Sequence, residues 1–272
     1  MCHTAARSRA TTSGVDDALD MTGRAVLVTG GAGGVGRGIT EAFLQRGADV
    51  VICGRTEPKV LPASAGREAA FIAADVRDAG LVDALIEATT ERLGHLDVVI
   101  NNAGGGPPAF VQGTSPRLHA SIITLNLIAP LFVAQRANDV MQVQDGGGCI
   151  INIGSLNGLH TSPGVAAYGA AKAGLLNLTQ SLAAEWAPRV RVNAVTAGII
   201  GTEEIFDVHY GNDPERLARL HAQVPMGRFT TPADVAGACL YLASPLAAQV
   251  TGANLVVHGG GDPPDALPSR PG

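Results

Sequence analysis

The amino-acid sequence predicts an α/β protein, a single domain built on a doubly wound parallel sheet of about seven strands. Two observations lead to this prediction. Short continuous apolar runs alternate along the chain with longer segments of helical composition, as in parallel strands joined by right-handed crossovers. The apolar runs also lack the in-and-out alternation of a half-exposed sheet, which indicates strands covered on both faces.

The predicted elements follow one another without a linker or an internal repeat. Seven apolar runs are interpreted as strands: 25–29, 49–53, 70–74, 96–101, 149–153, 190–195 and 254–257. Six segments of helical composition are interpreted as helices: 34–46, 79–93, 117–141, 166–187, 214–223 and 232–243. One sheet accounts for all of them, so residues 23–261 are expected to form one domain. Residues 1–22 are polar and aperiodic and residues 262–272 are rich in proline, so we expect a disordered N-terminal tail and a loose C-terminal tail.

Composition argues against several classes of function. Charged residues make up only 16% of the chain, against roughly 25% in an average soluble protein, and 46% of the residues are apolar. The net charge is −5 and no basic run occurs, so neither nucleic acid nor an anionic membrane surface is an expected partner. No uninterrupted apolar stretch approaches the ~18 residues of a membrane span, so no membrane insertion is expected.

Cysteine and histidine usage points to a reducing compartment and no metal. Cys2, Cys53, Cys149 and Cys239 are scattered and form no C-x-x-C motif, which indicates reduced thiols in a cytoplasmic protein. The seven histidines show no spacing typical of metal ligands.

A glycine-rich turn connects the first strand to the first helix. It reads Thr29-Gly-Gly-Ala-Gly-Gly-Val-Gly-Arg-Gly38. Glycines let backbone amides approach a pyrophosphate closely, and the N-terminus of the following helix attracts the same anion. In this strand–turn–helix context the turn predicts a Rossmann fold that binds a dinucleotide through Gly30, Gly33, Gly34, Val35 and Gly36.

The end of the second strand indicates which dinucleotide is preferred. An NAD site usually has an Asp or Glu there to bind the ribose 2′-hydroxyl. This strand instead ends Cys53-Gly-Arg-Thr56, without an acid. A guanidinium pairs well with a 2′-phosphate, so Arg55 and Thr56 are expected to bind NADP(H). Glu57 partly offsets this charge, and NAD(H) stays an alternative cofactor.

A serine, a tyrosine and a lysine form a candidate acid/base site. Ser155 follows an apolar run, and Tyr168 and Lys172 lie farther along, four residues apart. On a helix, residues i and i+4 share a face. A nearby ammonium favours the phenolate and is expected to lower the tyrosine pKa from about 10. Such a phenol is a general acid/base, and Ser155 is expected to hold the substrate oxygen beside it.

These motifs resemble the classical short-chain dehydrogenase/reductase family from about residue 21 to residue 261. The resemblance also rests on Asp75-Val76, on Asn101-Asn-Ala-Gly104, on Asn126 and on Gly198-x-x-x-Thr202. The extended relatives share the glycine spacing of the turn, but they are longer chains.

The resemblance implies a role for each matching residue. Asp75 and Val76 would bind the adenine, and Asn126 would kink its helix around a water of the proton relay. Ser155 would bind the substrate carbonyl, Tyr168 would pass the proton, and Lys172 would also bind the nicotinamide ribose. The remaining implied cofactor residues are Asn102, Ala103 and Gly104 on the adenine-ribose side, Gly198 after the sixth strand, and Ile200 and Thr202 at the nicotinamide carboxamide.

Three positions depart from the family pattern. Ala197-Gly198 stands where the family usually has Pro-Gly, Gly33 replaces a common serine, and His258 stands where an aspartate is more usual. The third position lies near subunit contacts in relatives, so His258 is not assigned a catalytic role.

The predicted function is that of an NAD(P)-dependent oxidoreductase which transfers a hydride between NADP(H) and a ketone or secondary alcohol, with Tyr168 as general acid/base. Two alternatives stay open: a non-catalytic dinucleotide sensor, and a lyase or epimerase that runs on a transient hydride transfer. A small-molecule substrate is expected to contact residues 203–226, and His160 and residues 105–110 are further candidates. The resemblance also implies a homo-oligomer, either a tetramer or a dimer.

Overall fold

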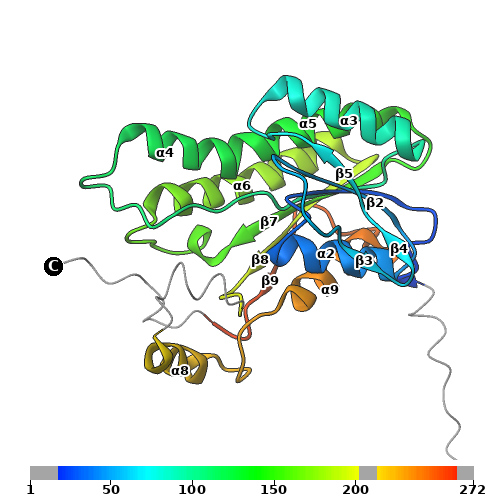
Figure 1. Ribbon diagram of the computed structural model, residues 1–272. Coiled ribbons are helices and arrows are strands. Elements are labelled where there is room, and N and C mark those ends of the chain that lie inside the picture. The colour runs from blue at the N-terminus through cyan, green and yellow to red at the C-terminus, as the bar shows by residue number, and fades with distance from the viewer. Residues whose placement is uncertain (1–17, 202–212, 262–272) are drawn as a thin grey trace, which may run out of the picture.

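A seven-stranded parallel sheet forms the centre of the protein. The computed structural model describes residues 18–201 and 213–261. Within them the sheet has the order β5-β2-β1-β6-β7-β8-β9, and all neighbouring strands are parallel (Figure 1). The predicted doubly wound sheet is therefore confirmed. Its strands are β1 (Ala25–Thr29), β2 (Asp49–Gly54), β5 (Ala70–Ala73), β6 (Val98–Asn101), β7 (Gly148–Ser155), β8 (Val190–Ala197) and β9 (Asn254–Val257).

The strand order reverses between β1 and β6. The chain adds β2 and β5 on one side of β1, and then crosses to the other side to begin β6. Parallel sheets of this kind bind their ligands at the carboxyl ends of the strands beside such a reversal, because the loops that follow the two strands diverge there. The topology therefore places the candidate site after β1 and β6.

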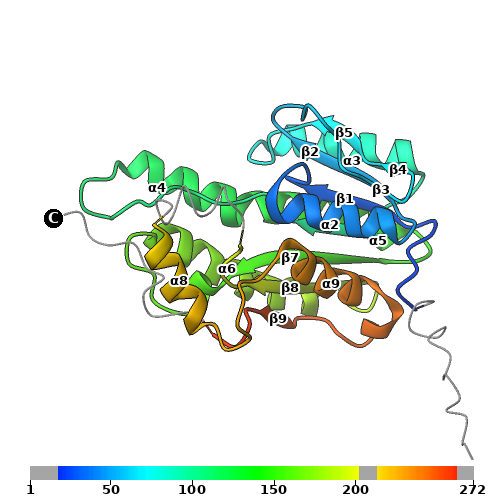
Figure 2. The same cartoon turned by 60° about the horizontal axis from the view of Figure 1, so that its bottom comes forward.

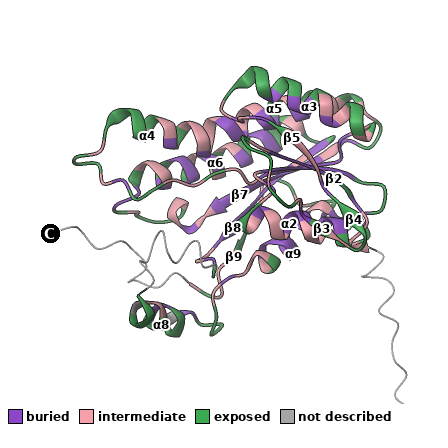
Figure 3. Ribbon diagram, in the orientation of Figure 1, coloured by how far each residue is buried: buried purple, intermediate pink, exposed green. Residues whose placement is uncertain are grey.

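Helices cover both faces of the sheet. α3 (Ala79–Leu93), α5 (Ala129–Val143) and α6 (Ala166–Trp186) lie on one face, and α2 (Gly34–Gln45) and α9 (Pro232–Ala243) lie on the other (Figure 1). Figure 2 shows α2 and α9 side by side. Val26 and Val28 of β1 point into the core under α2 and α9, whereas Leu27 points into the opposite core. Burial on both faces explains the continuous apolar sequences of the central strands such as β1, and Figure 3 shows the buried centre of the sheet between partly exposed helices.

Two helices, α3 and α9, begin at the residues that the sequence predicts, and each has a side-chain cap at its start. Asp78 accepts a hydrogen bond from the Leu81 amide at 3.1 Å at the start of α3. Thr231 and Asp234 form a capping box at the start of α9. α2 differs, because its N-cap is Gly33, which makes no side-chain cap, and its first turn holds no acid. The amides that begin α2 are therefore left for another acceptor.

The segment predicted as one helix over 117–141 is divided. It consists of α4 (Pro116–Ile123), a π-helical turn (Thr124–Ile128) and α5. A further element that the sequence analysis missed is a small hairpin of β3 (Ala63–Ser64) and β4 (Arg67–Glu68). α8 (Pro214–Gln223) has the predicted bounds.

The expected N-terminal tail is too long by several residues. Residues 18–22 belong to the folded part, because Met21 is only 1% exposed and its amide donates to the Arg46 carbonyl at 2.8 Å. Met21 thus belongs to the core under α2. Residues 1–17 and 262–272, which make up the rest of the two expected tails, lie outside the described residues.

Among the described residues, one helical run is long and apolar enough to cross a membrane by length and composition. It spans Pro116–Val143 and has a mean hydropathy of 1.5 over an 18-residue window. Length and composition are weak indications, because core helices of soluble proteins meet the same criterion. This run packs against α3 and α6, and 33% of the window is buried in the protein.

The described cysteines are reduced, as predicted. Cys53, Cys149 and Cys239 are buried free thiols, and Cys2 lies outside the described residues. Burial raises the pKa of the Cys53 thiol to about 12, against a weaker opposing hydrogen bond from the Gly30 amide. Cys53 is therefore an unreactive packing residue, although it lies beside the candidate site.

Candidate active site

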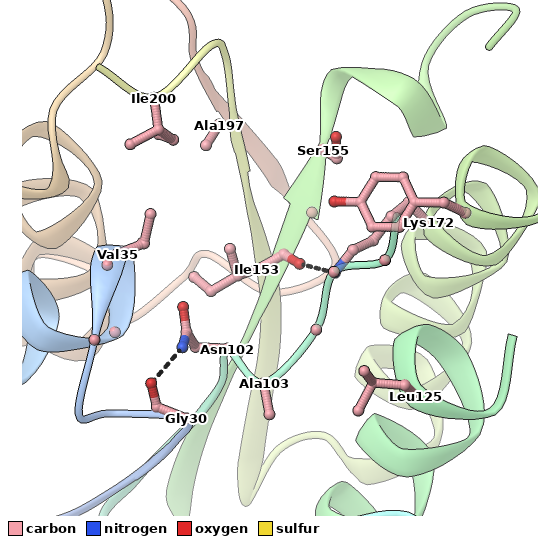
Figure 4. Close-up of a pocket in the computed structure, with 18 of the residues that line it drawn as sticks. Gly30, Val35, Asn102, Ala103, Leu125, Ile153, Ser155, Lys172, Ala197 and Ile200 are labelled. Atoms are coloured by element: carbon pink, nitrogen blue, oxygen red, sulfur yellow. Dashed lines mark hydrogen bonds between the residues drawn. The ribbon is translucent and has the colours of Figure 1, made fainter. Parts of the chain in front are cut away.

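A cleft of about 860 Å³ crosses the carboxyl ends of the central strands. The glycine turn lies at one side of it, and Ser155 and Lys172 lie at the other, with Ile153 of β7 between them (Figure 4). The lining comes from the segments after β1, β2, β5, β6, β7 and β8 and from α6. The site therefore lies beside the strand reversal.

The serine, tyrosine and lysine come together as predicted. Tyr168 and Lys172 lie one turn apart on α6, and Ser155 is the last residue of β7. The Ser155 hydroxyl lies close enough to Tyr168 to lower the pKa of the phenol. Lys172 is only 4% exposed, and its Nζ donates to the Ile153 carbonyl at 2.8 Å and lies 5.7 Å from the centroid of the Tyr168 ring (Figure 4).

The proton affinities of this group differ from the expectation. Burial raises the pKa of Tyr168, and the neighbouring Ser155 hydroxyl opposes the rise only in part. Burial also lowers the pKa of Lys172, to about 8. The expected lowering of the tyrosine pKa is wrong in direction for this structure, because desolvation outweighs stabilisation of the phenolate. Tyr168 is thus a protonated phenol at neutral pH.

Asn126 joins the π-helical turn to the loop after β6. Its Oδ1 accepts from the Gly105 amide at 2.8 Å, and its Nδ2 donates to the carbonyls of Gly105 and Ile122, both at 2.9 Å. A Cβ on Gly104 would lie 2.8 Å from Asn126 Oδ1 and 3.3 Å from Lys172 Nζ. Asn126 is fully buried and holds this loop against the lysine.

The glycine turn brings the backbone close to the strand ends. Gly30 has a φ of +64°, and its amide donates to the Cys53 carbonyl at 2.9 Å. A Cβ on Gly36 would lie 2.5 Å from the side-chain nitrogen of Asn102, so only glycine fits there. At Gly33 and Gly34 an added Cβ would meet nothing within 4 Å, because the cleft lies open beside them.

Asn102 and Ala103 connect the glycine turn to the loop after β6. Asn102 Nδ2 donates to the carbonyls of Thr29 and Gly30 at 3.0 and 3.1 Å (Figure 4). The amides of Asn102 and Ala103 both donate to Thr29 Oγ1 at 3.0 Å. Thr29 is a positioning residue that the sequence analysis did not identify. Its place at the end of β1, directly before the glycine turn, could have indicated this role.

Charged side chains gather at the end of the cleft that lies after β2 and β5. Arg55, Asp75, Val76 and Arg77 line the cleft there, whereas Thr56 does not. The Arg77 guanidinium hydrogen-bonds both carboxylate oxygens of Asp75, with Nε–Oδ1 at 2.9 Å and Nη2–Oδ2 at 2.5 Å. These bonds lower the pKa of Asp75 to about 2, and the charge of Arg55 contributes to the shift. Arg77 was not predicted as a site residue, although it follows Asp75 by two positions.

The loop after β8 closes the far end of the cleft. Gly198, Ile199 and Ile200 line it, and Ile200 forms a parallel β-bridge with Thr230. A Cβ on Gly198 would lie 2.9 Å from the Cα of His258, so the backbone packs tightly here. His258 itself is outside the cleft lining, and its Nδ1 accepts from the Gly260 amide at 3.1 Å. Thr202 lies outside the described residues.

Only some of the residues that were expected to contact substrate line the cleft. Residues 203–212 lie outside the described part of the chain. Gly105, Gly106 and Pro107 line the cleft, but His160 is exposed and absent from the lining. The structure adds other lining residues that the sequence analysis missed, namely Leu125, Leu156, Asn157 and Val165.

Comparison with known proteins shows the family of this chain. A family model described as "Enoyl-(Acyl carrier protein) reductase" matches residues 30–261. The 3-oxoacyl-[acyl-carrier-protein] reductase of Vibrio cholerae is 35% identical over 245 residues, which is 89% of this chain and 98% of the relative. The chain belongs to the short-chain dehydrogenase/reductase family. Its curated relatives are oxidoreductases, and so is this family member.

Two solved structures show the range of cofactors among such folds. NADPH-dependent 3-quinuclidinone reductase from Rhodotorula rubra matches with a TM-score of 0.82 and 27% identity, covering 94% of this chain and 97% of that one. NAD⁺-bound xylitol dehydrogenase matches with a TM-score of 0.81 and 27% identity, covering 88% and 99%. Similarity of fold therefore leaves the choice between NAD and NADP to the residues of the cleft.

Proposed function

We propose that this family member transfers a hydride between NADP(H) and a ketone or secondary alcohol of small size. The observation that carries the proposal is that Ser155, Tyr168 and buried Lys172 line one end of a cleft whose other end is an uncapped helix N-terminus. A sensor that only bound a dinucleotide would need the helix N-terminus but not the phenol.

The residues present fit a dinucleotide. The amides that begin α2 have no side-chain cap, and the open space at Gly33 and Gly34 leaves room for a pyrophosphate against them. Val76 and Ala103 are suited to the adenosine part, and Lys172 and Ile200 to the nicotinamide part. When bound, the nicotinamide supplies or accepts a hydride at its C4.

Ser155 and Tyr168 then act on the substrate oxygen. As the carbonyl carbon is reduced, negative charge grows on that oxygen, and the Ser155 hydroxyl donates a hydrogen bond to it. Tyr168 is protonated at neutral pH and gives its proton to the same oxygen. The ammonium of Lys172 stabilises the phenolate that is left, and in the oxidative direction the proton moves back.

Preference for NADP(H) is proposed on the basis of Arg55. Its side chain lines the cleft at the end of β2, and β2 itself ends without the acid that would bind a ribose 2′-hydroxyl. A guanidinium pairs well with a phosphate and has no comparable partner in NAD.

The described substrate end of the cleft suits an uncharged organic group. Apart from Lys172, none of the described residues that line this end carries a charge, and Leu125, Leu156 and Val165 are apolar. We therefore propose a neutral ketone or alcohol as substrate. A cytoplasmic homo-oligomer, tetramer or dimer, stays a proposal from the family resemblance.

The proposal is tested by fluorescence titration of the purified protein with NADPH and NADH, followed by assays of cofactor oxidation with a panel of carbonyl compounds. We expect tighter binding of NADPH and turnover of at least one ketone. Tyr168→Phe should lower turnover by about 10²-fold or more while NADPH affinity stays nearly unchanged. The matched control is Tyr241→Phe on α9, which is outside the cleft lining and should retain full activity. Near-normal turnover in Tyr168→Phe would contradict the mechanism, and binding of neither nucleotide would contradict the whole proposal.

A further inference from the structure

Asp75 is a negative charge at the end of the cleft where Arg55 is proposed to bind the 2′-phosphate. It lines the same end of the cleft as Arg55, and the two are close enough for the arginine to affect the carboxylate pKa. A bare carboxylate there would repel a 2′-phosphate and would offset the attraction that Arg55 provides. Cofactor preference therefore depends on how the charge of Asp75 is compensated.

Arg77 compensates it directly. The Nε of Arg77 contacts Oδ1 and Oδ2 of Asp75 at 2.9 and 3.2 Å, Nη2 contacts Oδ2 at 2.5 Å, and the Arg77 amide donates to Oδ1 at 3.1 Å. The pair is formed within one turn of chain and is only partly exposed, with side-chain exposures of 34% for Arg77 and 26% for Asp75. A two-pronged contact of this kind holds both partners in a fixed geometry.

The charge balance at this end of the cleft follows from three residues. Arg55, Asp75 and Arg77 are the charged side chains that line it among the described residues. Together they carry one net positive charge. Without Arg77 the sum would be zero, and without the carboxylate it would be two positive charges.

We propose that Arg77 is a positioning residue for cofactor choice: it neutralises and fixes Asp75, so that the charge of Arg55 acts on the 2′-phosphate of NADP(H) without opposition. This inference rests on the proposed function of the cleft. Arg77 acts through Asp75, and the cofactor preference follows the net charge of the three residues.

The test is a set of charge permutations read out by nucleotide binding. The dissociation constants of NADPH and NADH are measured by fluorescence titration for the full-length wild type, Arg77→Gln, Asp75→Asn and the double variant. We expect the preference for NADPH over NADH to fall about tenfold in Arg77→Gln, the effect of a binding difference of about 1.4 kcal/mol. It should rise in Asp75→Asn and return close to the wild-type value in the double variant.

The ratio of the two constants separates this role from a structural one. Loss of an adenine contact or local unfolding weakens NADPH and NADH together, whereas the charge effect acts on NADPH alone and shrinks at high salt. The matched control is the exposed pair of Arg67 and Asp49, 2.9 Å apart and away from the cleft, where the same exchanges should leave the ratio unchanged.

Two results would overturn the inference while the proposed function stands. An unchanged ratio in Arg77→Gln would show that Arg77 does not affect cofactor choice. A double variant as low as Arg77→Gln would show that Arg77 binds the phosphate itself and does not act through Asp75. Failure of the wild type to bind either nucleotide would overturn the proposed function and this inference together.

Discussion

Lys172 should make the stability of the protein rise with pH in the alkaline range. Its side chain is 4% exposed, and burial lowers its pKa from 10.5 to about 8. Since the folded-state pKa is the lower one, the unfolded chain binds more protons between these two values, and stability rises with pH there. A shift of this size corresponds to about 3 kcal/mol, at about 1.4 kcal/mol for each pKa unit.

The comparison that isolates this effect is wild type against Lys172→Met. Methionine fills a similar space without a titrating group, so the other ionisable residues are common to both proteins. We expect the free energy of unfolding of the wild type, relative to the variant, to rise by about 2–3 kcal/mol from pH 7 to pH 10. Well below pH 8 the difference should be level, because the lysine is then protonated in both states.

Urea unfolding followed by circular dichroism at pH 7, 8, 9 and 10 measures the difference. The variant also loses the hydrogen bond from Lys172 Nζ to the Ile153 carbonyl, but that loss shifts the whole curve and leaves its slope unchanged. A difference in unfolding free energy that is constant from pH 7 to pH 10 would refute the reasoning, since it would mean that Lys172 titrates alike in the folded and unfolded chains.

Two further predictions concern the loop after β6 and the carboxylate of the adenosine end. Gly104→Ala should destabilise the protein by about 1–3 kcal/mol and lower turnover, because the new Cβ would lie 2.8 Å from Asn126 Oδ1. The control is Gly237→Ala on α9, where the new Cβ would meet nothing within 4 Å. This control should be stabilised in thermal unfolding, because alanine favours a helix over glycine. Equal melting temperatures for the two variants would contradict this. Asp75 has its pKa lowered to about 2, chiefly by its bonds with Arg77, so its contribution to stability is present above its ordinary value of 3.8 and is lost as pH falls toward 2. Acid unfolding of Asp75→Asn should lack that part of the pH dependence, and a curve parallel to the wild type would count against the assignment.

The sequence by itself determined the seven strands of the central sheet and their alternation with helices, whereas it missed the β3–β4 hairpin and the π-helical turn. β1 and β9 have the predicted bounds. β1 is buried along its whole length, so its sequence is continuously apolar. α3 and α9 begin where the sequence predicts, since Asp78 and Thr231 cap the amides of the next turn. The glycine turn and the spacing of Tyr168 and Lys172 were also sufficient to locate the two ends of the cleft.

Contacts between distant segments were decided by the tertiary structure. Asparagine is uncommon in strands, yet Asn101 and Asn152 lie on neighbouring strands of the sheet. Asn101 Nδ2 donates to Asn152 Oδ1 at 2.9 Å. Asn152 Nδ2 in turn donates to Thr179 Oγ1 on α6, also at 2.9 Å. The network satisfies polar groups that would otherwise be buried without partners, and it joins β6, β7 and α6 beneath the site.

The pKa values of Tyr168 and Lys172 were also decided by the tertiary structure. Spacing alone places an ammonium beside a phenol, and it predicts a lowered tyrosine pKa. The fold buries both groups and raises the pKa of Tyr168 while it lowers that of Lys172. The sequence determines which groups meet, because helical and strand periodicity are local. Only the tertiary structure decides how much water each group loses, and desolvation sets the sign of the shift.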